Sequence, residues 1–334
     1  TTAASGYTSQ GRNAGHIRNR GYEIQLGAVP IQTSKGFRWN LDLNYGANRS
    51  KVIKLDDEGL ITSYQLYSSG IQILASVGEA YGTLYGTSYV RDANGSIVVD
   101  ANGLPKISTT NKTLGKFTPD WTGGVSNTFS YRSLSLSFLI DASVGGSIFS
   151  NTNKTGKYTG VLANTLPGRD AEHGGLWYYT DAMGNNVRLS ESPSYSVSSD
   201  GLYYAQVNGQ STRVYQDGIM VEGVTESGSK NEEVVSAEKY YHRIYSIAEA
   251  NVYDASYVKL REVALSYRLP RLWTQKLHLQ EASVTLTGRN LWTIYKSVPN
   301  IDPESALTTG NAQGVEAYSL PTTRSFGVNL SVKF

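Results

Sequence analysis

The chain has 334 residues, of which 39% are hydrophobic; glycine (34) and tyrosine (24) are abundant, whereas phenylalanine (7) and methionine (2) are scarce. Lysine and arginine (30) nearly balance the acidic residues (28) without a dense basic run, which argues against nucleic acid as a partner. Cysteine is absent, which excludes disulfides and thiol chemistry, and no apolar run reaches the about 20 residues that a membrane helix needs.

The first two predicted strands each have an apolar and a polar side. We expect them at residues 20–30 and 36–50, joined by a short turn. In the second, apolar residues recur at every other position, a period that predicts a strand with two different faces: Phe37, Trp39, Leu41, Leu43 and Tyr45. The apolar face fits either a second protein sheet or the acyl chains of a bilayer, and periodicity alone does not distinguish them.

A long polar stretch, residues 51–115, is predicted to be a loop, and it contains Asp-Ala-Asn-Gly twice. Asp92, Asn94 and Ser96 imitate the start of a calcium-binding loop, so they are candidate metal ligands. However, Gly103 stands where such a loop needs a bidentate glutamate, and Asp-rich and Asn-Gly quartets are common in turns. We therefore favour ordinary turns and expect no cofactor.

Residues 116–131 and 133–148 are predicted to form a hairpin, and a second long loop, residues 150–254, follows it. Five aromatic residues of this loop are candidates for contact with a ligand, because flat rings stack on sugars and pack on peptide side chains: Trp177, Tyr178, Tyr179, Tyr203 and Tyr204. The alternative, which we favour, is that they form a small core that orders the loop.

The remaining predicted strands and the third long loop end the chain: strands at residues 255–270, 282–295 and 322–334, and the loop at residues 296–321. Asp302 and Glu304 in this loop are candidates for holding a ligand or a cation, although the proline between them also fits a rigid turn. The last strand alternates apolar and polar residues up to the final ring, its apolar set being Phe326, Val328, Leu330, Val332 and Phe334.

The apolar phase changes within residues 255–270. Val258 and Leu260 are even-numbered, but Val263 and Leu265 are odd-numbered. A β-bulge near Arg261 would absorb the extra residue, or else the strand has already left the membrane there. Charged residues on the predicted polar faces are candidates for lining a lumen: Arg38, Asp42, Asp141, Lys259, Arg261, Glu262 and Arg289.

Short and long connections alternate along about seven antiparallel strands, as in outer-membrane barrels with short periplasmic turns and long outer loops. This predicts an all-β fold with the C-terminus at the periplasmic side. Seven is odd and below the about eight strands of the smallest closed bacterial barrel, and an open sheet edge is costly in hydrocarbon. We therefore expect the chain to be the C-terminal part of a larger transmembrane barrel, with strands outside this sequence pairing with both sheet edges.

Several segments resemble the C-terminal third of SusC/RagA-type TonB-dependent outer-membrane transporters. The most specific are TPDWTGGVSNTFSY (residues 118–131) and ASYVKLREVALSY (residues 255–267), and the resemblance spans essentially the whole chain. It implies a barrel of about 22 strands with a plugged lumen. It further implies energy supplied through TonB, a SusD-like surface lipoprotein as partner, glycan or peptide cargo, and a terminal strand that the barrel-insertion machinery recognises.

The plug and the TonB-contacting segment of this family lie N-terminal to the barrel, so we expect neither within residues 1–334. The chain would supply wall, outer loops and terminal strand, with the remaining barrel, the plug and outer-membrane lipid as its partners. The predicted function is active import of oligosaccharides or peptides across the bacterial outer membrane. A surface adhesin or lectin built as a β-sandwich, and a passive porin, are the alternatives.

An enzyme is not expected. The histidines are scattered over predicted loops and turns, and neither a nucleophile-elbow motif nor an H-E-x-x-H motif accompanies them: His16, His173, His242 and His278.

Overall fold

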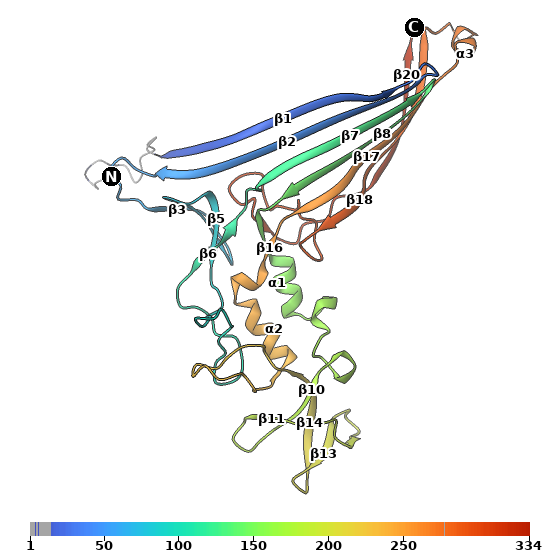
Figure 1. Cartoon of the computed structure of the whole chain (residues 1–334). Coiled ribbons are helices and arrows are strands. Elements are labelled where there is room, and N and C mark those ends of the chain that lie inside the picture. The colour runs from blue at the N-terminus through green and yellow to red at the C-terminus, as the bar shows by residue number, and fades with distance from the viewer. Residues whose placement is uncertain (1–3, 5, 7–14, 277) are drawn as a thin grey trace.

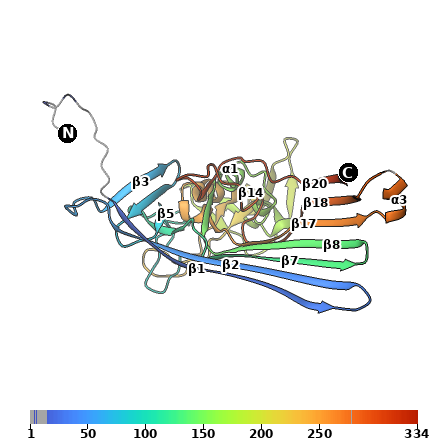
Figure 2. The ribbon, with the colours of Figure 1, turned by 90° about the horizontal axis from the view of Figure 1, so that it is seen from above.

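One large antiparallel sheet and a column of smaller elements make up the molecule (Figure 1). The structure, a computed structural model, describes residues 4, 6, 15–276 and 278–334. The large sheet has seven strands, seen side by side in Figure 2, in the order β1 (His16–Gln32), β2 (Phe37–Lys54), β7 (Trp121–Tyr131), β8 (Leu134–Val144), β17 (Tyr257–Arg268), β18 (Glu281–Lys296) and β20 (Ser325–Lys333). The predicted all-β fold with about seven antiparallel strands is confirmed.

Short connections join the strands at one end of the sheet, and long segments leave the other end. Residues 33–36 join β1 to β2, residues 132–133 join β7 to β8, and a segment with the helix α3 (Arg271–Lys276) joins β17 to β18. These connections and the C-terminus lie together at the upper right of Figure 1. The column is therefore built entirely at the opposite end of the sheet.

The long segments contain ordered elements where the sequence predicted loops. Residues 51–116 form β3 (Ser63–Ser68), β4 (Gln72–Ser76), β5 (Tyr81–Gly86) and β6 (Lys112–Lys116). The second segment begins with β9 (Ser147–Ser150), α1 (Asn151–Tyr158), η2 (Ala163–Thr165), η3 (Ala171–His173), β10 (Leu176–Thr180), β11 (Asn186–Arg188) and β12 (Tyr195–Val197). It continues with β13 (Tyr203–Val207), β14 (Gln210–Ile219), β15 (Val235–Ser236), α2 (Ala237–Tyr245), η4 (Ala248–Asn251) and β16 (Val252–Asp254); the third segment holds β19 (Val315–Glu316).

Two strand ends differ from the prediction because the column takes residues from the hairpin. Residues 112–116 form β6, which pairs with β5, so β7 begins only at Trp121. Residues 147–150 form β9, which pairs with β16 and with β19, so β8 ends at Val144. No helix within the described ranges is both long and apolar enough to span a membrane.

Serine caps start both main helices of the column. The Ser150 hydroxyl accepts a hydrogen bond from the backbone N–H of Asn153 at the start of α1. Ser236 does the same for Lys239 at the start of α2. Each cap satisfies a donor that the first helical turn leaves free, an effect of about 1 kcal/mol.

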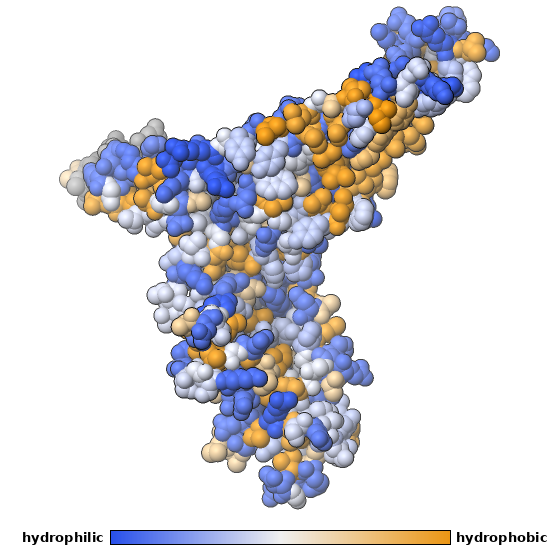
Figure 3. Space-filling view, viewed as in Figure 1, coloured by the Kyte–Doolittle hydropathy of each residue, from blue (hydrophilic) through white to orange (hydrophobic). Residues whose placement is uncertain are grey.

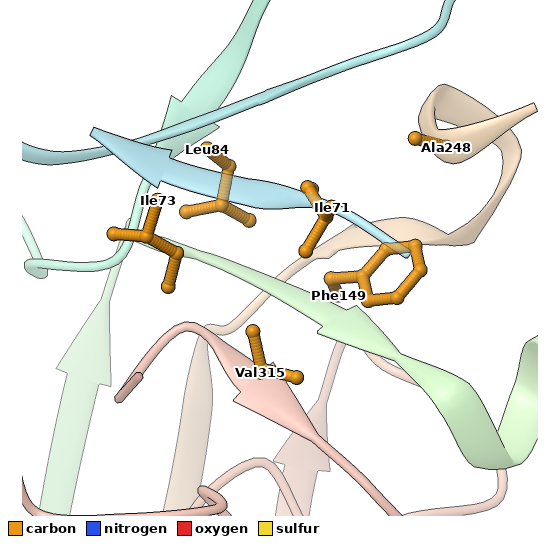
Figure 4. Packing of buried hydrophobic residues seen from close by; sticks show 6 residues of the cluster. All are labelled: Ile71, Ile73, Leu84, Phe149, Ala248 and Val315. Carbon is orange, nitrogen blue, oxygen red and sulfur yellow. The ribbon is translucent and has the colours of Figure 1, made fainter. Parts of the chain in front are cut away.

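A single hydrophobic core joins all three long segments (Figure 4). Its buried members come from the first segment, from the second and from the third: Ile71, Ile73 and Leu84; Phe149 and Ala248; and Val315. Burying each large aliphatic or aromatic side chain stabilises the fold by about 1.5–3 kcal/mol. The small sheet β16-β9-β19 reinforces the same junction. The three segments, which make up the column, are therefore packed together, and we call this packed body the loop platform.

The apolar positions of the seven strands share one face of the large sheet. Leu136 of β8 pairs with Leu265 of β17, and Leu286 of β18 pairs with both Leu265 and Val328 of β20. Leu136 is 39% exposed and Val328 is 73% exposed, so no second sheet covers them. The resulting apolar surface is visible on the upper right of Figure 3. The sandwich alternative, which requires this face to be buried, is wrong.

Aromatic rings form two rows on this apolar face. The rings of Tyr22, Tyr45 and Trp121 lie 6.2 Å and 5.5 Å apart across β1, β2 and β7. Nearer the short turns, the ring centroid of Phe129 lies 5.7 Å from that of Trp39 and 6.0 Å from that of Phe138, across β2, β7 and β8. Aromatic girdles on both sides of an apolar band are typical of barrels that cross a bilayer.

Both edges of the large sheet are open. Among the residues that the structure describes, β1 pairs only with β2, and β20 pairs only with β18. Every residue of these two strands is exposed. Unpaired backbone groups in hydrocarbon each cost several kcal/mol, so an open sheet with an apolar outer face needs further strands at both edges. The sheet is part of a larger β-barrel, as the strand count predicted.

Candidate functional site

A β-bulge in β17 lies within a cluster of charged residues at the column end of the sheet. Pairing of β17 with both β8 and β18 shifts register between Leu260 and Glu262. Arg261 is therefore the extra residue relative to β8, whereas on the other side Asn290 and Leu291 of β18 lie opposite it. Of the two explanations for the change of phase, the register shows the bulge, which explains how Leu260 and Val263 both stay in the apolar set.

Five charged residues meet beside this bulge, and we call them the charged seam: Asp141, Lys259, Arg261, Asp302 and Glu304. Lys259 Nζ lies 2.6 Å from Asp302 Oδ1 and 2.5 Å from Glu304 Oε2. Arg261 Nε lies 2.6 Å from Asp141 Oδ1, and its guanidinium also pairs with Glu304. The side chains of Lys259 and Asp302 are only 4% and 8% exposed, so this pair is screened little by solvent.

The seam keeps the two loop carboxylates ionised. Burial by itself would raise the pKa of the Asp302 carboxyl, but hydrogen bonds from Lys259 and Thr322 outweigh burial and lower this pKa to about 2. Burial likewise opposes ionisation of Glu304, and hydrogen bonds from Arg261 and Lys259 lower its pKa. Both groups are therefore charged at neutral pH.

Neutral hydrogen bonds complete the seam. The Thr322 hydroxyl donates to Asp302 Oδ2 at 2.5 Å, and the Tyr257 hydroxyl donates to Glu304 Oε1 at 3.0 Å. Asp302 and Glu304, expected as contacts for a ligand or cation, thus have their oxygens occupied by the wall and by their own segment. The two loop candidates and three of the wall candidates, which the sequence kept apart, form a single cluster.

The other lumen candidates lie on the polar side of the sheet outside the seam. Glu262 Oε2 accepts a hydrogen bond from Arg289 Nε at 2.8 Å across the β17–β18 pair. Arg38 Nε donates to Asn40 Oδ1 at 2.8 Å, and Asp42 is exposed opposite Ser126. These side chains alternate with the apolar set, so they share the face that lipid would not contact.

Two of the aromatic candidates of the second segment are buried, and their rings contact other rings of the same segment. Trp177 is 7% exposed and Tyr178 is 4% exposed. Trp177 lies 5.1 Å from the ring of Tyr195 and 5.8 Å from that of Tyr203. The Tyr178 hydroxyl donates to Asp217 Oδ1 at 3.1 Å, and burial raises the pKa of that hydroxyl. This packing favours the core interpretation for Trp177 and Tyr178, while Tyr179, Tyr203 and Tyr204 are half-buried.

The Asp-Ala-Asn-Gly repeats are turns. Asp92 Oδ1 accepts from the backbone N–H groups of Asn94 and Ser96, at 2.9 Å and 2.8 Å. Asp100 makes the corresponding pair of bonds in the second repeat. A carboxylate oxygen that caps its own turn in this way is typical of Asx turns. Within the part of the chain that the structure describes, no three His, Cys, Asp or Glu side chains are placed to hold a metal ion.

A groove of about 930 Å³ opens on the column between the first and second segments. Its walls come from residues 91–97, 167–176 and 218–224, from Lys230 and from α2. It offers ionic, aromatic and aliphatic groups together, among them Arg91, His173, Glu222, Lys230, Tyr241 and Met220. No sequence pattern indicated this groove, because parts of its wall are more than 100 residues apart along the chain, as are Arg91 and Glu222.

Comparisons with known proteins match the chain over nearly its whole length. It is 26% identical to TonB-dependent receptor P3 and 25% identical to TonB-dependent receptor P26, both of Formosa agariphila, over 99% of this chain in each case. The chain spans only 30% of the length of these curated relatives. No protein-family model matches the chain.

Solved structures show the same fold. A structure of the RagAB peptide transporter covers 100% of this chain with 31% of its own, at a TM-score of 0.57 and 20% identity. The RagAB peptide importer in its closed-closed state gives a TM-score of 0.58 at 19% identity. The resemblance to part of a SusC/RagA-type TonB-dependent transporter, first indicated by sequence motifs, is confirmed by these matches.

Proposed function

We propose that this chain, similar to TonB-dependent receptors over 99% of its length, forms part of an active importer in the bacterial outer membrane. The observation that carries the proposal is the large sheet itself, apolar and uncovered on one face, polar on the other, and open at both edges. A sheet of this kind is stable when lipid covers the apolar face and further strands pair with the edges.

The orientation follows from the two ends of the sheet. The loop platform faces the cell exterior, and the short turns and Phe334 lie at the periplasmic side, since outer-membrane barrels have short periplasmic turns and long outer loops. The polar face, with Arg38, Asp42 and Arg289, lines a lumen that the plug of the intact protein fills. The apolar set of β20 directs insertion of the barrel.

The cargo is an oligosaccharide or a peptide, delivered with a SusD-like surface lipoprotein and imported with energy from TonB. The likeness to RagAB, named as a peptide transporter, supports peptide as one of these classes. On the column, the groove with Arg91 and Glu222 is better suited to contact cargo than Trp177 or Tyr178, because its side chains are accessible. Tyr204 remains a further candidate.

Uptake by the intact transporter tests this function. Cells that carry the full-length gene are given labelled peptides or labelled oligosaccharides as two separate pools. We expect one pool to accumulate in the periplasm only when TonB is present. Equal accumulation without TonB would support the passive-porin alternative, and no accumulation of either pool would contradict import.

The groove is tested in the same cells with Glu222→Gln, which keeps the size of the side chain and removes its charge. We expect the concentration for half-maximal uptake to rise several-fold. Glu226→Gln is the matched control, because Glu226 pairs with Lys106 on the exposed surface and does not line the groove. Equal uptake by both variants would remove the groove from the cargo path.

A further inference from the structure

Besides the burial of Val298 and Ile301 against Ile148, the segment between β18 and β20, residues 297–324, is held to the rest of the chain at two places. We call this segment the strap. In its second half, Val315 lies in the shared core and β19 pairs with β9. Glu316, fully buried, accepts hydrogen bonds from the hydroxyls of Ser150 and Thr152 at 2.7 Å and 2.5 Å. These contacts join the strap to the loop platform.

The charged seam is the second place, and it joins the strap to the barrel wall. Asp302 and Glu304 belong to the strap, whereas Lys259, Arg261 and Asp141 stand on β17 and β8. Thr322, close to the start of β20, bonds to the same Asp302 carboxylate. One carboxylate thus fixes both the beginning and the end of the strap beside β17.

The bulge keeps a third charged residue of β17 out of the apolar face. Lys259 and Arg261, two residues apart, lie on the polar side of the strand and face the strap. A regular strand would place residue 262 on the apolar side. Because of the bulge, Glu262 also lies on the polar side, where it bonds to Arg289.

Beyond the seam the strap is not packed tightly on the wall. A groove of about 340 Å³ separates residues 303–313 of the strap from the strand ends around Ser143 and Tyr257. Glu304 lines this groove and also belongs to the seam. On the wall side of the groove, the seam joins the strap to β17 by charge pairing, in addition to the burial of Val298 and Ile301 against Ile148.

We propose that Lys259 and Arg261 are positioning residues that hold the strap across the loop-side end of the β8–β17–β18 wall. This proposal does not rest on the proposed function, because it concerns only where the strap lies.

Distance measurements between spin labels on the intact transporter test the position of the strap. This chain has no cysteine, so labels at Thr309→Cys on the strap and Lys35→Cys in the β1–β2 turn introduce the only thiols of this region. Cysteines elsewhere in the intact protein are replaced by serine. The seam variant combines Lys259→Met, Asp302→Asn and Glu304→Gln, which leaves Arg261 paired with Asp141 and no buried charge without a partner.

We expect the label distance to be narrow in the unmodified seam and to broaden or shift in the seam variant. Arg268→Gln with Glu281→Gln is the matched control. This exposed ion pair links β17 to β18 at the other end of the sheet, and its loss should leave the distance unchanged. An unchanged distance in the seam variant overturns the proposal.

Two further variants keep the test decisive. If the triple variant does not insert, Asp302→Asn alone removes one partner of Lys259 and is expected to broaden the distance. Lys259→Arg keeps the charge and should restore the narrow distance and the uptake; restored uptake with a still broadened distance contradicts a positioning role. Absence of TonB-dependent uptake in the unmodified protein would refute the proposed function but would not alter the distance result.

Discussion

Lys259 shows how a buried cation is accommodated at the end of a membrane strand. Its ammonium group meets two carboxylates at 2.6 Å and 2.5 Å, and both come from a segment more than 40 residues away in the sequence. Removing one partner of a buried pair is costly because the other charge is left without compensation. The seam therefore specifies one position for the strap.

At this residue scale, the seam should withstand moderate acid. The pKa of Asp302 falls from its ordinary value of 3.8 to about 2 in the folded chain. A lowered carboxyl pKa contributes stability above the ordinary value, and this stability is lost as the pH falls towards about 2. We expect the Thr309–Lys35 label distance to be the same at pH 7 and pH 5. A change between these two values would contradict this assignment of charge.

The shared core of the loop platform gives a second test on single residues. Phe149→Ala removes a fully buried ring that contacts elements of three segments, which should lower stability by about 3–5 kcal/mol. Limited proteolysis of the intact transporter would show faster cleavage in all three long segments. Leu320→Ala is the control, since Leu320 is 91% exposed and should change nothing. Faster cleavage in one segment only would mean that the segments fold independently.

Among the elements, β20 carries the alternation most clearly. Val328 lies on the apolar face beside Leu286, whereas its neighbour Asn329 lies on the polar face beside Thr285. Strand position and exposure are alike for the two residues, so only the solvent that each face meets should distinguish them.

Lysine substitution measures that difference. Val328→Lys places a cation on the lipid side and should reduce the stability of the inserted barrel by about 2–4 kcal/mol near the midplane. Asn329→Lys should have little effect. Unfolding of the intact transporter in lipid vesicles with urea gives both values. Equal losses for the two variants would mean that lipid does not contact this face.

The molecule as a whole is an open sheet with a rigid body attached to one end. The apolar face, the two aromatic rows and the open edges are features of a segment of barrel wall. The column extends from one end of this wall. Because the three long segments share a core, we expect them to move as a unit rather than as separate loops.

The open edges predict a specific protection pattern in the intact transporter. Amide hydrogens of β1 that point away from β2 should exchange as slowly as those bonded to β2, since a neighbouring strand would pair with them. Hydrogen exchange followed by mass spectrometry measures both sets, with the turn at residues 33–36 as a rapidly exchanging control. Fast exchange along the outer edge of β1 would contradict a continuous barrel.

The sequence by itself determined the strands, their two faces, the change of phase near Arg261 and the incompleteness of the sheet. These features are local, because alternation with a period of two and a change of phase are visible within about ten residues. It did not determine the ordered platform, the burial of Trp177 or the groove beside Glu222. Only the tertiary structure joined Asp302 to Lys259 and Phe149 to Val315, since such contacts depend on how distant segments pack, and side-chain period carries no information about that.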